Sequence, residues 1–115
     1  MNFFFTDDPV EFLQAKLEYY RSQKNKSAWT QKALSKRLGY RSDRSIGMVL
    51  KRQRCLTPPL VSGLGKVLNL TPQEYRYFDL LVQRDRLLKR GIDSSFIDRE
   101  LQSYKTSLNA PIILR

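Results

Sequence analysis

The stretch TQKALSKRLGYRSDRSIGMVLKRQR, residues 30–54, decides the expected fold, because it joins two short helical patterns through a glycine. Leu34 and Leu38 recur at the four-residue spacing that places apolar side chains on one face of a helix. Thr30 precedes them and can accept a backbone N–H hydrogen bond at the start of this helix. Gly39 follows where the chain must turn, since glycine reaches positive φ without a Cβ clash. These residues predict a short helix that ends at a sharp turn.

A second helix is expected at about residues 43–52. Ser42 and Asp43 supply a cap and an acidic first turn, and Ile46, Val49 and Leu50 follow at helical spacing. Only this one stripe is apolar. The other faces carry side chains for which the stretch itself offers no obvious partner, namely Arg44, Ser45, Met48, Lys51 and Arg52. The pattern predicts a helix-turn-helix whose second helix is free to meet another molecule.

This motif resembles the phage repressor and Cro type of helix-turn-helix, in which the second helix enters the major groove of DNA. The positions that carry the resemblance are Thr30, Gln31, Leu34, Ser35, Leu38, Gly39, Ile46 and Val49. Ile46 lies seven positions after Gly39, one more than in that family's pattern, so the turn is expected to be one residue longer. The resemblance implies a sequence-specific DNA-binding protein.

A wider resemblance covers residues 38–82, LGYRS...VLKRQRCLTPPLVSGLGKVLNLTPQEYRYFDLLV. This part is similar to the N-terminal region of a bacterial family of paralogous regulators, whose members usually carry a further C-terminal domain. The sequence leaves open whether such a domain belongs to this protein.

The charge of the chain is concentrated in one region. Residues 21–54 hold eleven Lys or Arg and one acid, so they account for the whole net charge of +10, and the other 81 residues sum to zero. Such a local excess favours a polyanion, although a basic run can also be a solvated surface. Its coincidence with the helix-turn-helix favours double-stranded DNA.

The composition argues against several other functions. The chain has one cysteine, Cys55, and no histidine, so neither an internal disulfide nor a Cys/His zinc site is expected. It offers no nucleophile beside a base, and the nearest acidic cluster, Asp93, Asp98 and Glu100, is expected to serve a helix dipole. We expect no enzyme, no cofactor and no metal. Met1 to Phe5 has neither the length nor the basic lead of a signal or spanning segment, so a cytoplasmic location is expected, with no membrane partner.

The rest of the chain is also expected to be helical. Cap and proline signals with periodic apolar residues predict helices from Pro9 to about Ser22, after Thr57, from Thr71 to Arg90, and from about Phe96 to Asn109. The fold class is therefore all-α, with five to six helices of phage-repressor type and extra C-terminal helices. We expect residues 1–91 to form the DNA-binding domain and residues 92–115 to serve dimerisation or partner contact.

Two further segments have alternative interpretations. Trp29 is expected to pack against the core, with stacking on a base as the alternative. The apolar tail Ile112-Ile113-Leu114 follows Pro111 and could dock on the fold, pair with the edge of a partner, or precede a further domain.

The length and charge of the side chains indicate which of them would contact base edges and which would contact phosphates. Base edges are expected to meet Ser42, Asp43, Arg44, Ser45 and Met48. Phosphates are expected to meet Thr30, Gln31, Lys32, Arg41, Lys51, Arg52 and Arg54; the role of Gln31 follows from the family resemblance.

A homodimer is expected, because proteins of this type usually place two copies about one DNA turn apart. Two other functions remain alternatives. One is a protein-interaction adaptor that binds a regulatory protein through residues 71–109 or the tail. The other is an RNA-binding module, although the aromatic residues lie at core spacing and not on a stacking platform.

Overall fold

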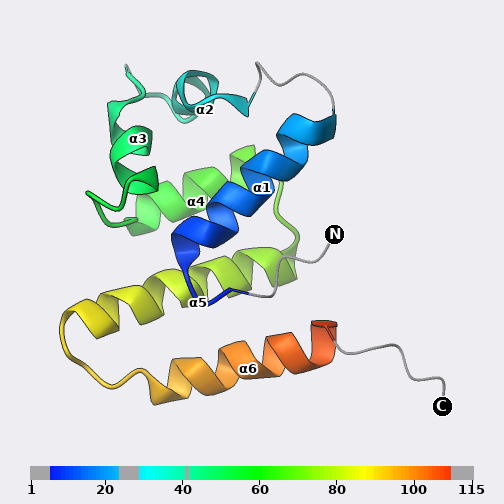
Figure 1. Ribbon diagram of the computed structural model, residues 1–115, viewed down its shortest axis with the longest axis vertical. Helices are drawn as coiled ribbons and strands as arrows, with labels where there is room; N and C mark the ends of the chain where they lie inside the picture. The colour runs from blue at the N-terminus through cyan, green and yellow to red at the C-terminus, as the bar shows by residue number, and fades with distance from the viewer. Residues whose placement is uncertain (1–5, 24–28, 41, 110–115) are drawn as a thin grey trace, which may run out of the picture.

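The computed structural model describes residues 6–23, 29–40 and 42–109, with side chains up to Lys105. Within these residues the chain forms helices and no strands, so the all-α prediction is confirmed. The helices are α1 (Pro9–Gln23), α2 (Gln31–Arg37), α3 (Arg44–Leu50), α4 (Pro58–Val67), α5 (Pro72–Lys89) and α6 (Ser95–Asn109). Figure 1 shows α2 and α3 at one edge of the molecule and α6 at the opposite edge, with α1, α4 and α5 between them.

Three helices begin at the threonines that the sequence pattern indicates. The Thr30 hydroxyl accepts the Ala33 backbone N–H at 3.2 Å. The Thr57 hydroxyl accepts the Leu60 backbone N–H at the start of α4, and the Thr71 hydroxyl accepts the Glu74 backbone N–H at the start of α5. At Thr71 the predicted capping box is complete, because the Glu74 carboxylate also accepts the Thr71 backbone N–H at 3.0 Å. Local capping chemistry therefore fixes these boundaries.

Helix α5 forms the centre of the molecule. Its buried side chains include Tyr77 and Phe78, and the Phe78 ring stacks on Phe12 of α1 with a centroid distance of 5.3 Å. The helix also packs against α4 and α6, which explains why its sequence is apolar on more than one side. Ile97 and Leu101 of α6 belong to the same core. The division of function at residue 91 stays a prediction, but α6 shares its hydrophobic core with the helix-turn-helix.

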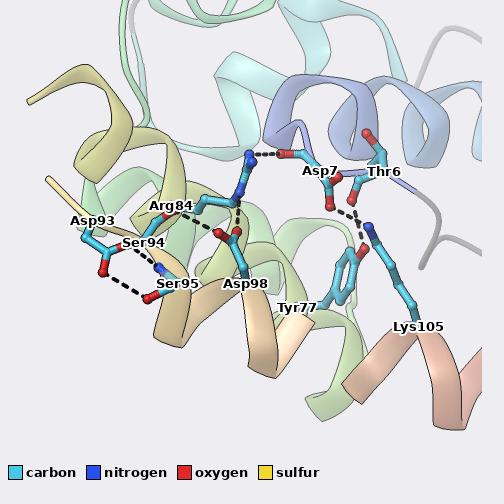
Figure 2. Close-up of polar contacts among 9 residues, drawn as sticks. All are labelled: Thr6, Asp7, Tyr77, Arg84, Asp93, Ser94, Ser95, Asp98 and Lys105. Atoms are coloured by element: carbon cyan, nitrogen blue, oxygen red, sulfur yellow. Dashed lines mark hydrogen bonds and ion pairs between the residues drawn. The ribbon is translucent and has the colours of Figure 1, made fainter. Parts of the chain in front are cut away.

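Polar contacts hold the segment before α1 against α5 and α6 (Figure 2). The buried Tyr77 hydroxyl donates to the Thr6 carbonyl at 2.8 Å, and Lys105 of α6 forms an ion pair with Asp7. Arg84 of α5 bridges the Asp7 carbonyl and the Asp98 carboxylate. Burial raises the pKa of Tyr77 to about 12, with a further contribution from Asp7. Residues at the two ends of the described chain thus lie together on α5.

Two glycines of α4 lie at close contacts with other side chains. A Cβ on Gly63 would lie 2.8 Å from the Leu38 side chain, and one on Gly65 would lie 2.4 Å from the Tyr75 ring. A side chain at Gly63 would have to displace the end of the Leu38 side chain, and one at Gly65 would have to displace the Tyr75 ring. No helix in the described part of the chain is long and apolar enough to cross a membrane.

Candidate nucleic-acid interface

Helices α2 and α3 pack together with one face of each in the core. Leu34 of α2 and Ile46 and Val49 of α3 are completely buried. Gly39 has φ of +86° and begins the turn between them, as the glycine pattern predicts. Helix α1 also packs against α3. The apolar stripe of α3 is thus fixed from two sides, and the opposite side of the helix faces outward.

Helix α3 differs from its prediction at both ends. It spans Arg44–Leu50 and not residues 43–52. Arg52 has φ of +64°, a left-handed conformation that a right-handed helix cannot continue through. At the other end, Asp43 is the N-cap but its side chain makes no capping bond, and the Ser42 hydroxyl accepts the Arg44 backbone N–H at 3.4 Å. Asp43 therefore precedes the helix and is not the first-turn acid that was expected, whereas Ser42 accepts a backbone N–H as a capping residue does.

The outward face of α3 carries Arg44, Met48 and Lys51, which are separated by four and three positions. This spacing brings their side chains to one side of the helix. They line a shallow, open concavity of about 350 Å³ together with Gln31, Asp43, Gly47 and Gln53. The concavity therefore brings together two cations, two amides, a carboxylate and a flexible apolar side chain.

Gly47 was not singled out by the sequence pattern, although a glycine inside a helix costs roughly 1 kcal/mol relative to alanine. The structure gives the reason. A Cβ on Gly47 would lie 3.1 Å from Oε1 of Gln31. Glycine at this position lets the Gln31 amide rest against the backbone of α3. Its presence in a short helix was the signal that could have found this contact.

Arg52, Arg54 and Ser45 are engaged elsewhere. Arg52 forms an ion pair with Asp8, the residue that caps α1 by accepting the Val10 backbone N–H at 2.9 Å. Arg54 Nη1 donates to the Ser45 hydroxyl at 3.3 Å. None of the three lines the concavity on α3. The stretch 30–54 offered Arg52 no obvious partner, and the structure supplies one from outside it, 44 positions earlier in the chain.

A second hollow of about 700 Å³ lies beside the turn between α2 and α3. It is lined by Lys32, Ser35, Lys36, Tyr40, Ser42 and Asp43. The sequence pattern singled out Lys32, Ser42 and Asp43 for DNA contact but not Lys36 or Tyr40. Lys36 is exposed, and Tyr40 is 38% exposed. The side chains of these two residues are therefore accessible to a phosphate that Lys32 contacts. The turn brings Lys36 and Tyr40 close to Lys32, and no local sequence pattern indicates this proximity.

Trp29 packs against the core, as expected, and stacks on Tyr20 with a centroid distance of 4.4 Å. The Arg37 guanidinium lies 4.7 Å from the Trp29 ring centroid, and Arg21 Nε donates to the Trp29 carbonyl at 2.9 Å.

The Thr30 hydroxyl caps α2. Arg41, Lys24, Lys26 and the tail that contains Ile112 to Leu114 lie outside the described residues.

The acidic cluster near residue 93 has structural roles. Two hydrogen bonds from Ser95, one from its backbone and one from its hydroxyl, lower the pKa of Asp93. Asp98 pairs with Arg84, and Glu100 pairs with Arg76, both on α5. Among the residues that the structure describes, no group of three or more His, Cys, Asp or Glu could hold a metal ion. The cluster thus tethers α6 to α5.

Comparison of the chain with protein-family models, with curated proteins and with solved structures found no match.

Proposed function

We propose that this protein is a sequence-specific double-stranded DNA-binding regulator of transcription that inserts α3 into the major groove. The observation that carries the proposal is the outward stripe of Arg44, Met48 and Lys51 on a helix whose opposite side is completely buried. A major groove is wide enough for an α-helix, and its base edges offer the acceptors and methyl groups that such side chains recognise. The resemblance of residues 30–49 to the repressor type of motif supports the same pose.

The charge distribution supports a polyanionic partner. All ten net positive charges fall in residues 21–54, which contain α2 and α3. Lys32 and Lys36 are exposed on α2, and Lys51 is exposed at the end of α3. Both helices of the motif thus carry exposed cations, which would meet the phosphates that border a groove. A second copy bound about one turn away would double these contacts.

Arg44 is the side chain that we expect to recognise a base most strongly, because a guanidinium can donate two hydrogen bonds to guanine. Ser42, Asp43 and Met48 are its nearest candidates for neighbouring bases. Ser45 accepts a hydrogen bond from Arg54, and its hydroxyl still has a proton to donate to a base. Lys51, Lys32 and Gln31 are proposed to fix the register through phosphates.

Selection of bound duplexes from a random pool, followed by titration of the best duplex in rising salt, tests the function. If about six phosphates are neutralised, the logarithm of the affinity should fall against the logarithm of salt with a slope of roughly −5. Arg44→Ala should cost about 1–3 kcal/mol of binding free energy and relax the preference at one base pair. Arg99→Ala is the matched control, because Arg99 is exposed on α6 at the opposite edge from α3 (Figure 1). An equal loss on every sequence would contradict base recognition by Arg44.

A protein-interaction adaptor is the second candidate, and the turn between α5 and α6 favours it. Leu88, Ile92 and Phe96 are 50%, 47% and 65% exposed there. Three large apolar side chains exposed within residues 88–96 suit a protein contact site. Failure of the pure protein to bind duplex DNA, together with a stable complex with a protein partner, would establish the adaptor. Preference for single-stranded or duplex RNA in the same titration would instead indicate the RNA-binding module.

A further inference from the structure

The concavity on α3 contains a notch that the sequence pattern did not reveal. Gly47 lies between Arg44 and Lys51 on the outward side, and it lacks the side chain that would otherwise fill the space beside them. The amide of Gln31 occupies this space, since its Oε1 lies 3.1 Å from the position of a Cβ on Gly47. Helix α2 thus contributes one polar group to the outward face of α3.

The chemistry of an amide distinguishes two possible roles for Gln31. A phosphate offers only acceptors, so it can engage the amide NH₂ but leaves the amide oxygen without a donor. The major-groove edge of adenine offers the N7 acceptor beside the N6 amino donor, and a glutamine amide matches both at once. A side chain needed only for a phosphate would be served equally well by lysine, and it would not require a glycine beneath it.

We infer that Gln31 recognises an adenine through the notch that Gly47 leaves in α3, in addition to or in place of the phosphate role expected for it. This inference rests on the proposed function, because it requires α3 to lie in the major groove. It makes Gln31 and Gly47 a specificity pair: Gln31 supplies the hydrogen-bonding groups, and Gly47 leaves room for the amide that carries them.

Three variants separate the two roles. Gln31→Ala removes the amide. Gly47→Val fills the notch but leaves the Gln31 amide chemically intact, and valine carries no helix penalty relative to glycine. Lys32→Ala, on the next residue of α2, removes an exposed cation and is the matched control for a phosphate contact. Thermal unfolding of each variant confirms that it folds before its binding is measured.

The assay is selection of duplexes from a random pool by the wild type, followed by titration of each variant against the selected duplex. The titration is repeated with a duplex in which one A·T pair is replaced by G·C. Wild type should distinguish the two duplexes by about 5- to 100-fold at one such pair. Gln31→Ala and Gly47→Val should both abolish discrimination at that pair, whereas Lys32→Ala should weaken binding to both duplexes equally.

The inference is overturned if Gln31→Ala weakens binding to every sequence equally, as a phosphate contact would. It is also overturned if Gly47→Val folds and retains the wild-type preference at every position. Both results leave the proposed function standing, because the wild type still selects a sequence. A wild-type protein that selects no duplex at all refutes the proposed function itself, and the inference with it.

Discussion

Glu74 makes two interactions at the start of α5, and replacing it measures each of them. Its Oε1 accepts the Thr71 backbone N–H at 3.0 Å, and its Oε2 lies 2.7 Å from Nζ of Lys16 on α1. The side chains of Lys16 and Glu74 are only 6% and 12% exposed. Water therefore screens this ion pair poorly, and loss of the carboxylate leaves a cation in the interior.

Glu74→Gln isolates the charge, since glutamine serves as well as glutamate in a capping box. Removal of one partner of a buried pair costs about 3–5 kcal/mol. We expect the lower end of this range, because the Lys16 ammonium still lies 5.5 Å from the Tyr20 ring centroid and retains that cation–π contact. Glu74→Ala also removes the cap and should cost about 1 kcal/mol more. Lys16→Met removes the buried cation and leaves Glu74 at a helix N-terminus that favours an acid, so it should cost less than about 2 kcal/mol.

Urea unfolding followed by circular dichroism near neutral pH gives the free energy of unfolding of each variant. The expected order of destabilisation is Glu74→Ala, then Glu74→Gln, then Lys16→Met, with equal dependence on urea concentration. The double variant Lys16→Met/Glu74→Gln should be more stable than Glu74→Gln alone. The reasoning fails if Lys16→Met destabilises as much as Glu74→Gln, or if the double variant is the less stable one.

Two further predictions concern single carboxylates. Asp8→Asn keeps an acceptor for the cap of α1 but breaks the partly exposed ion pair with Arg52, so it should cost less than about 1 kcal/mol. If the released Arg52 contacts a phosphate, the DNA salt slope should steepen by about 0.9; an unchanged slope argues against that contact. Asp93 has a pKa held below its ordinary 3.8 by Ser95, so its contribution to stability is present above that pH and is lost as pH falls through the lowered pKa. Acid unfolding of Asp93→Asn should therefore depend less steeply on pH below about 4, and identical slopes for the two proteins would disprove this.

Much of the helical framework was predictable because its signals are local. Thr30, Thr57 and Thr71 bond to backbone groups three residues ahead, so the residues that define each helix start are adjacent in the sequence. Gly39 likewise ends α2 through its own backbone conformation. Apolar spacing then indicated which face of each helix is buried, as Leu34 shows. Hence the all-α class, the two short helices joined by a turn at Gly39 and the outward stripe of α3 could be anticipated.

The sequence by itself determined where α2, α4 and α5 begin and which side chains of α3 point away from the core, because capping and periodicity act within a few residues. Only the tertiary structure decided which partners those side chains have. Arg52 forms an ion pair with Asp8, and the Gln31 amide of α2 lies beside Gly47 of α3. Such contacts join positions that are distant or on different helices, and no local spacing encodes them, because they exist only once the helices have packed.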